Sequence, residues 1–250
     1  MPTPAEIVVH ADADAVAEAL ASRLTSTLAD LQARGRTPQV CLTGGGIATK
    51  AYARLAADGP GDVDWSRVDL WWGDERFVPA GDADRNADAT VEALRGPLRL
   101  DDAHLHVMPA SGAGLDLDEA AAAYARELGE TVFDVCLLGM GPDGHVASLF
   151  PGHPDAGAPG TVIPVRDSPK PPPERLSVTM EVINRSAQVW FCVSGAEKAE
   201  AVAKGVLGTG PDPVPASRAT GTEATVWLVD EAAVADLPDS LPGGAERVEV

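Results

Sequence analysis

The chain has 250 residues, 45% of them hydrophobic, and a formal net charge of -19 at pH 7. This hydrophobic content excludes a mainly disordered chain, and the longest apolar runs fall well short of the ~18 residues that a membrane-spanning helix needs. The acidic charge disfavours nucleic acid and anionic membrane surfaces as partners, because both require a positive footprint. Since the N-terminus lacks an export signal, we expect a cytoplasmic protein, monomeric or weakly dimeric, that acts on a small molecule.

Apolar runs of strand length alternate with helical patterns from end to end. Strands are predicted at 6–10, 38–43, 67–72, 104–108, 133–139, 161–165, 175–180, 187–195 and 224–229. Helices are predicted over about 16–31, through "ATKAYARLAA", near 86–95, at 117–128, near 196–207 and after the last strand, before a tail at 238–250 that is expected to be partly disordered. This alternation is typical of a mostly parallel sheet with helices on both faces. We therefore predict one doubly wound α/β domain over 1–250, with ligands beyond the carboxyl ends of its strands.

Three cysteines, Cys41, Cys136 and Cys192, lie within predicted strands. They are too scattered for a zinc site and odd in number for a disulfide framework, so we interpret them as reduced core residues. No cluster of histidine and carboxylate residues has metal-ligand spacing, and we expect no metal.

The first candidate loop is "TGGGIATK", which follows the strand at 38–43 and contains Thr43, Gly44, Gly45 and Gly46. Glycines let the backbone approach a ligand closely, and the N-terminus of the following helix attracts an anion. The loop departs from a nucleotide-phosphate loop because Thr49 replaces the last glycine and Ala51 the magnesium-binding hydroxyl. A phosphate or carboxylate cradle is favoured, and a tight packing turn is the alternative.

A second loop, "GDERFVP", places Asp74, Glu75 and Arg76 directly after an apolar strand. Arg76 could hold a phosphate through two hydrogen bonds, and Asp74 could accept hydrogen bonds from sugar hydroxyls. The alternative is a solvated charged loop with an internal ion pair.

A third loop, "GMGPDGHVASLFPG" at 139–152, matches the spacing G-x-G-x-x-G of a dinucleotide site. Such a site needs a long helix after the last glycine, and Pro151 and Pro154 limit any helix there to about two turns. Asp143 and His145, two positions apart, can point to the same side. Because a histidine moves protons near neutral pH and a carboxylate can orient it, we predict a catalytic pair here, with a capping or packing role for His145 as the alternative.

The last candidate loop is "VSGAEKAEAV", where Lys198 lies in the first turn of a predicted helix. Its ammonium group would add a point charge to an anion site. With the glycine turn and Arg76, it makes a third anion-binding element.

Five segments occur together in one order: "TGGG", "GDERFVP", "FDVCLLGMGPDGHVASLFPGHP", "RLSVTMEVINRS" and "VSGAEKAEAV". In these segments the chain, from about residue 6 to 235, resembles the 6-phosphogluconolactonase family, whose sheet is similar to that of glucosamine-6-phosphate deaminase. The family loop commonly reads S-G-G-S/T, and here Thr43 and Gly46 occupy its ends.

The resemblance implies hydrolysis of 6-phospho-D-glucono-1,5-lactone to 6-phosphogluconate in the oxidative pentose phosphate pathway, without a cofactor. It implies that His145 is the general base on the attacking water, with Asp143 beside it. The glycine turn, Arg76 and Lys198 would hold the phosphate, and Arg185 in "INRS" is a further candidate. A lactone is already electrophilic, so positioning, a base and donors to the oxyanion suffice.

Two other functions are weighed against this one. An amino-sugar phosphate deaminase resembles the chain in the D-G-H segment, but its glutamate five residues after the histidine is replaced by Phe150, and its D-E-Y by "DER". A sugar-phosphate sensor of a transcription regulator would carry a basic helix-turn-helix segment, and none is evident.

Overall fold

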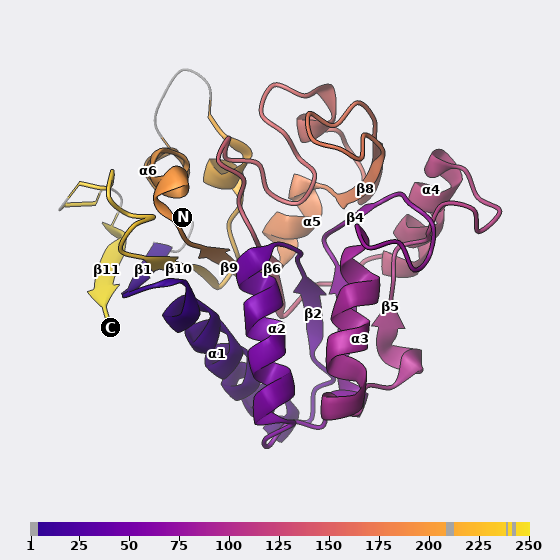
Figure 1. The fold of residues 1–250 in the computed structure, drawn as a ribbon, viewed down its shortest axis with the longest axis horizontal. Coiled ribbons are helices and arrows are strands. Elements are labelled where there is room, and N and C mark those ends of the chain that lie inside the picture. Colours follow the sequence, from indigo (N-terminus) through magenta and orange to yellow (C-terminus); the bar gives the residue numbers. More distant parts are fainter. Residues whose placement is uncertain (1–4, 209–212, 239, 242–243) are drawn as a thin grey trace.

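The computed structural model describes residues 5–208, 213–238, 240–241 and 244–250. Its main sheet has eight parallel strands in the order β11-β1-β10-β9-β6-β2-β3-β5 (Figure 1). These strands are β1 (Ala5–His10), β2 (Gln39–Leu42), β3 (Asp69–Trp72), β5 (Leu105–His106), β6 (Val135–Leu138), β9 (Gln188–Val193), β10 (Ala224–Asp230) and β11 (Glu246–Glu249). β6, at the centre, is buried along its whole length, as expected for a strand covered on both faces.

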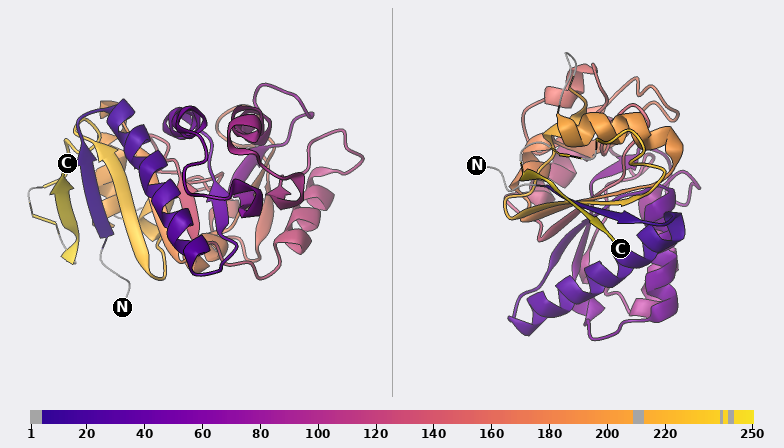
Figure 2. Two further views of the ribbon diagram at one scale, coloured as in Figure 1. Left: turned by 90° about the horizontal axis from the view of Figure 1, so that it is seen from below. Right: turned by 90° about the vertical axis from the view of Figure 1, so that its left-hand side faces the viewer.

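Helices cover both faces of this sheet (Figure 2). One apolar core unites one face with α1 (Ala13–Ala33), α2 (Gly46–Asp58) and α3 (Asn86–Leu98). A second core unites the opposite face with α4 (Leu117–Leu128), α5 (Met180–Arg185) and α6 (Ala199–Leu207). The predicted doubly wound fold class is confirmed. None of the helices within the described ranges is long and apolar enough to cross a membrane.

A small antiparallel sheet stands beside the main one, in the order β4-β8-β7. It consists of β4 (Asp74–Arg76), β7 (Val162–Val165) and β8 (Arg175–Val178). Gly73 alone separates β3 from β4, so the chain passes directly from the main sheet to the small one. The sequence predicted a loop where β4 lies, and it did not distinguish β7 and β8 from strands of the main sheet.

The chain differs from the predicted elements in two further places. The predicted strand at 175–180 ends at Val178, because the Thr179 hydroxyl accepts a hydrogen bond from the Val182 amide and starts α5. The predicted helix after β10 is wrong, because the segment after Asp230 forms hydrogen-bonded turns and no regular helix. Pro238 leaves this segment too short for more than two turns of helix. In the tail that was expected to be partly disordered, residues 246–249 form β11 and pair with β1.

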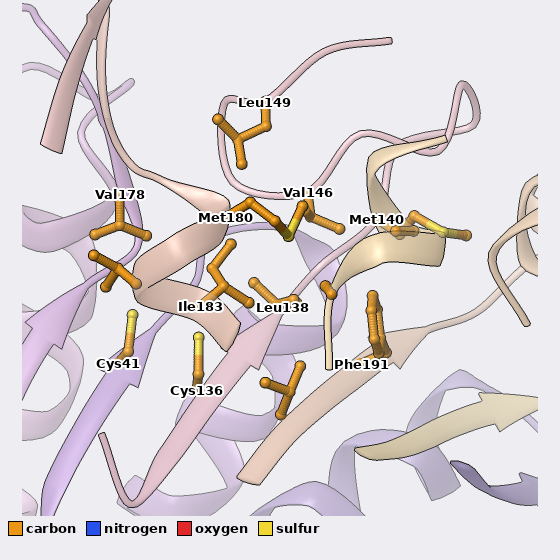
Figure 3. Packing of buried hydrophobic residues seen from close by; sticks show 14 of the residues in the cluster. Cys41, Cys136, Leu138, Met140, Val146, Leu149, Val178, Met180, Ile183 and Phe191 are labelled. Atoms are coloured by element: carbon orange, nitrogen blue, oxygen red, sulfur yellow. The ribbon is translucent and has the colours of Figure 1, made fainter. Parts of the chain in front are cut away.

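The core beneath the carboxyl edge of the sheet holds two of the cysteines (Figure 3). Cys41 of β2 and Cys136 of β6 are cross-strand neighbours, and Ile183 of α5 covers this face. All three cysteines are free and buried, as predicted. Burial is the main cause that raises the pKa of Cys41 well above its ordinary value, so the thiol stays protonated and inert.

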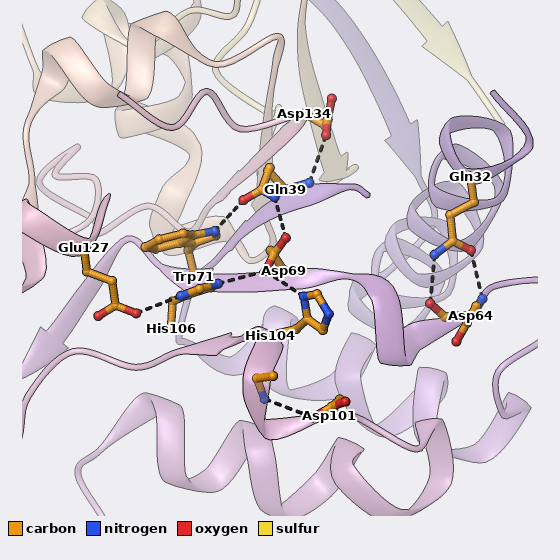
Figure 4. Close-up of polar contacts among 11 residues, drawn as sticks. Gln32, Gln39, Asp64, Asp69, Trp71, Asp101, His104, His106, Glu127 and Asp134 are labelled. Carbon is orange, nitrogen blue, oxygen red and sulfur yellow. Dashed lines mark hydrogen bonds and ion pairs between the residues drawn. The ribbon is translucent and has the colours of Figure 1, made fainter. Parts of the chain in front are cut away.

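A polar cluster lies at the opposite edge, near the amino ends of β2 and β3 (Figure 4). One carboxylate oxygen of Asp69 lies 2.9 Å from His104 Nδ1 and 2.9 Å from His106 Nε2. The other ring nitrogen of His106 lies 2.8 Å from Glu127 Oε1, and the ring stacks on Trp71 with centroids 3.8 Å apart. These contacts fix the short edge strand β5 to the sheet.

Candidate active site

A cleft of about 270 Å³ opens at the carboxyl ends of β2, β3 and β6. The loop after β2 leads into α2 on one face of the sheet, whereas the chain after β6 continues over the other face. Such a divergence of neighbouring strands is where α/β sheets bind ligands. The cleft is lined by Thr43, Gly44, Gly45, Asp74, Arg76, Asn86, Gly139, Met140, Gly141, His145, Ala147, Phe150, Lys170, Pro171, Arg175 and Lys198.

His145 and Asp143 form a pair in the loop after β6. Nδ1 of His145 lies 2.5 Å from Asp143 Oδ1, and the imidazole packs against the Phe150 ring with centroids 4.6 Å apart. Burial lowers the pKa of His145, and Asp143 opposes this shift without cancelling it. Burial acts to raise the pKa of Asp143, but the charge and hydrogen bond of His145 outweigh it, so that pKa is lowered. His145 is therefore a neutral base at neutral pH, with Nδ1 engaged and Nε2 left for chemistry.

Gly141 makes room for this pair. A Cβ atom at Gly141 would lie 2.1 Å from both Nδ1 and Cε1 of His145 and 2.4 Å from Asp143 Oδ1. The Gly141 amide also donates to the His145 carbonyl at 3.0 Å. The glycine is needed because the histidine ring rests directly on the backbone. Residues 139–152 form turns and a short bridge, not the long helix of a dinucleotide loop.

The glycine turn after β2 forms the opposite wall. Thr43 Oγ1 accepts a hydrogen bond from the Gly139 amide at 3.2 Å, which ties this loop to the loop after β6. Gly44 is pressed against the side chain of Asn86, which a Cβ atom would meet at 2.2 Å. Gly46 begins α2 and lines a neighbouring recess of about 420 Å³, which shares Gly44, Gly45 and Lys198 with the cleft.

β4 brings Asp74 and Arg76 to the cleft. The buried carboxylate of Asp74 accepts a hydrogen bond from Ser148 Oγ at 2.7 Å. Arg76 Nη1 donates to the Asp84 carbonyl at 3.0 Å and to the Asn86 side chain. One carboxylate and one guanidinium are thus held in fixed positions against the cleft.

Two predicted site residues, Glu75 and Arg185, have structural roles instead. Glu75 is fully buried, and its carboxylate accepts hydrogen bonds from the amides of Asn86 and Ala87, at 2.8 Å each, so it caps the start of α3. Arg185, at the end of α5, donates to the Gly129 carbonyl at 3.0 Å. Because β9 begins only three residues later, Arg185 lies at the amino edge of the sheet, opposite the cleft.

Lys198 lies where the cleft meets the recess, as its position in the sequence predicted. Its Nζ donates to the Met140 carbonyl at 2.9 Å. Burial lowers the pKa of Lys198. The ammonium is thus anchored between the loops that follow β2 and β6.

Sequence reasoning missed three polar residues of the cleft: Asn86, Lys170 and Arg175. Lys170 and Arg175 belong to the proline-rich segment "SPKPPPER". Two cations so close together in a chain with a net charge of -19 are a signal that could have found them. Nothing local in the sequence marks Asn86, because it reaches Arg76 only through the fold of the segment between β4 and α3.

The cleft is positive in a strongly acidic protein. Among the described residues that line it, four are cationic and one, Asp74, is a carboxylate. Surroundings of low dielectric constant strengthen the attraction between these charges and a ligand of opposite charge. The cleft can therefore bind an anion next to a histidine base. The described part of the chain contains no group of three or more His, Cys, Asp or Glu side chains that could hold a metal ion.

Residues 11–227 match a family model described as glucosamine-6-phosphate isomerases/6-phosphogluconolactonase. The chain belongs to this family. Among curated members, "6-phosphogluconolactonase" of Streptomyces coelicolor is 46% identical, over 94% of this chain and 96% of its own length. The protein of the same name from Mycobacterium tuberculosis is 42% identical, over 93% of this chain and 98% of its own length.

Solved structures of family members share the fold. The crystal structure of 6-phosphogluconolactonase from Thermotoga maritima superposes with a TM-score of 0.81 at 28% identity, over 91% of this chain and 100% of the other. A monomeric glucosamine-6-phosphate deaminase superposes with a TM-score of 0.75 at 19% identity, over 92% of this chain and 99% of the other, and shows the fold alone. The family predicted from the sequence motifs is confirmed, and the names of its curated members support the predicted enzyme class.

Proposed function

We propose that the chain hydrolyses 6-phospho-D-glucono-1,5-lactone to 6-phospho-D-gluconate, with His145 as the general base. The observation that carries this proposal is the His145 and Asp143 pair, 2.5 Å apart, at the wall of a cleft lined by four cations. The names of the curated relatives give the substrate class. The geometry gives a base for water and cations for a phosphorylated, anionic ligand.

In the proposed reaction a water molecule adds to C1 of the lactone while its proton passes to His145 Nε2. Asp143 holds the imidazolium that forms. The oxyanion on C1 then expels the ring oxygen, and the C1–O bond breaks as His145 returns the proton to that oxygen. The products are the free hydroxyl and the open-chain carboxylic acid, which releases its remaining acid proton to solvent at neutral pH, and the base is regenerated.

The phosphate is assigned to the end of the cleft where Gly44, Gly45 and Lys198 lie. The start of α2 offers backbone amides to an anion there, and the Lys198 ammonium adds a charge. Arg76, fixed by Asp84 and Asn86, is the second phosphate contact. Binding energy from a phosphate remote from C1 would serve to orient the lactone.

Phe150 favours lactone hydrolysis over amino-sugar deamination. The sequence resemblance places a glutamate of the deaminase at this position, where it assists ring opening. In this chain Phe150 is 2% exposed and its ring packs against His145. An apolar ring there lowers the basicity of the histidine by burial and offers no second acid or base.

A coupled assay with freshly generated lactone tests the function. We expect turnover well above spontaneous hydrolysis, and a decrease of at least about 10²-fold in kcat for His145→Ala. His104→Ala, at the opposite edge of the sheet, is the matched control and should keep its kcat. Wild-type protein no faster than the background would overturn lactone hydrolysis, and unchanged turnover of His145→Ala would remove His145 from the base role.

A further inference from the structure

A proline-rich segment between β7 and β8, residues 166–174, passes beside the cleft and is called the strap here. Lys170 and Pro171 of the strap line the cleft. Lys170 is exposed, and within the described part of the chain its ammonium has no hydrogen bond or ion pair. A free cation at the rim of a ligand cleft is available to a ligand.

Arg175 holds the backbone of the strap. Its guanidinium donates to the carbonyls of Lys170, Pro171 and Pro172 at 3.1 to 3.2 Å. Arg175 itself is 6% exposed and lies over the Phe150 ring, 5.9 Å from the centroid. Because Arg175 is buried and binds three successive carbonyls, it fixes the backbone of Lys170. The ammonium group of Lys170 remains free within the described part of the chain.

Lys170 lies at the histidine end of the cleft. The glycine-turn end of the cleft is the part that is shared with the neighbouring recess, and it is lined by Gly44, Gly45 and Lys198. The other part of the cleft is not shared with the recess, and it is lined by Lys170, Arg175 and His145. The charge of Lys170 reaches both Lys198, whose pKa burial lowers first and Lys170 lowers further, and His145. Burial is the main cause of the lowered pKa of that histidine, Lys170 lowers it further, and Asp143 and Asp74 act to raise it.

We propose that Lys170 contacts the reacting end of the substrate, where its ammonium stabilises the oxyanion on C1 and then the carboxylate of the product. Arg175 is the positioning residue that holds the strap for it. This inference rests on the proposed function. It assigns the two ends of the cleft to two different anions: the phosphate to the glycine turn and Lys198, and the developing negative charge of the reaction to Lys170.

A pair of ligands tests this division. 6-Phospho-D-gluconate carries a phosphate and a carboxylate, whereas D-glucitol 6-phosphate carries the phosphate alone. In isothermal titrations we expect Lys170→Met to weaken binding of the first about tenfold, as for loss of one charge-assisted contact, and to leave binding of the second nearly unchanged. Equal weakening for both ligands would place Lys170 at the phosphate, and no weakening would remove it from the site; either result overturns the inference.

Kinetics supply a second test. We expect kcat of Lys170→Met to fall at least tenfold, as for loss of one oxyanion contact, and Lys170→Arg to retain most of it. Because Lys170 lowers the pKa of His145, its removal should move the acid limb of the kcat profile to higher pH. A merely structural role would not move this limb. Lys204→Met removes the same charge from an exposed ion pair with Glu200 and is the control.

The two proposals fail separately. If the wild-type protein does not hydrolyse the lactone, the proposed function is wrong, and the ligand pair still tests the position of Lys170 because it needs no turnover. If the wild-type protein hydrolyses the lactone and Lys170→Met matches it in kcat and in both affinities, only the inference about Lys170 is wrong.

Discussion

His145 is set by neighbours that act in opposite directions on its proton affinity. Burial lowers its pKa, and the charge of Asp143 and its hydrogen bond of 2.5 Å offset part of this shift. Because its pKa lies below the ordinary value of 6.5, the ring is a neutral base at neutral pH. The carboxylate of Asp143 stabilises the charged ring that forms when the base takes up a proton. A catalytic base needs both properties, since it must be free of its proton before the reaction and hold it during the reaction.

Asp143→Asn separates these two properties. We expect kcat to fall about 10²-fold or more, because the imidazolium loses its carboxylate and the ring its orientation. The pKa of His145 falls further without Asp143, so the acid limb of kcat should move to lower pH, the reverse of the shift expected for Lys170→Met. The profile is measured on kcat, since the substrate phosphate itself titrates near pH ~6. An acid limb that stays in place would show that another group limits the rate.

Gly141→Ala tests the contact between backbone and base. The added methyl group would lie 2.1 Å from the His145 ring, so the ring must move. A displacement of about 1 Å can lower the rate about 10²-fold, and we expect a loss of this order with a lowered melting temperature. Gly96→Ala in α3 is the control. Its methyl group meets nothing within 4 Å beyond its chain neighbours, and Gly96 does not line the cleft, so kcat should not change.

The sequence could predict those site residues that follow parallel strands directly. Thr43 and Asp74 follow a strand end within two positions, His145 lies in the loop that begins where β6 ends, and parallel strands place such residues at one edge. It could not predict that Glu75, in the same charged run, turns inward to cap α3. Neighbouring side chains on a strand point to opposite sides, and only the position of α3 decides which side is buried.

At the scale of elements, most strands of both sheets could be predicted, whereas β4, β11 and the division into two sheets could not. Strands such as β6 are continuous apolar runs, which is typical of strands that are covered on both faces. β4 has three charged residues and pairs with β8, about a hundred positions further along the chain. A short polar strand carries no periodic signal, so the pairing that brings β8 to the cleft escaped prediction, and with it the place of Lys170 and Arg175 in the site.

The polar cluster around Asp69 makes a prediction at this scale. Asp69 accepts hydrogen bonds from three side chains: those of His104, His106 and Gln39. Asp69→Asn should lower the free energy of unfolding at pH 7 by about 1–3 kcal/mol, because one acceptor oxygen of a half-buried side chain becomes a donor that faces another donor. We expect kcat to be unchanged, since the cluster lies at the edge opposite the cleft. Urea unfolding followed by tryptophan fluorescence measures the loss.

The pH dependence of this loss has a definite sign. Burial acts to raise the pKa of Asp69, but the hydrogen bonds from His106, His104 and Gln39 outweigh it and lower the pKa. The carboxylate therefore contributes its full stability at neutral pH and loses it as the pH falls through the lowered pKa. The difference between Asp69→Asn and the wild type should shrink at acid pH. Asp102→Asn, in an exposed pair with Arg95, should change little at any pH.

At the scale of the whole molecule, charge is distributed unevenly. The protein carries a formal charge of -19, yet its cleft gathers four cations around one carboxylate. These cations come from β4, from the strap, from β8 and from the turn before α6, which are far apart in the sequence. A dianionic sugar phosphate in the cleft would join β4 to the turn before α6 through Arg76 and Lys198, and so its binding should stabilise the fold as a unit.

Thermal unfolding with D-glucitol 6-phosphate tests this linkage. A ligand that binds only the folded state at 100 times its Kd adds about 2.7 kcal/mol, which in a chain of this size corresponds to a rise of roughly 5–10 °C in Tm. Lys198→Met should lose most of this rise, because it removes a phosphate contact, whereas His145→Ala should keep it, because the base takes no part in holding the phosphate. If Lys198→Met keeps the full rise, the phosphate lies elsewhere in the cleft, and the assignment of its two ends must be reversed.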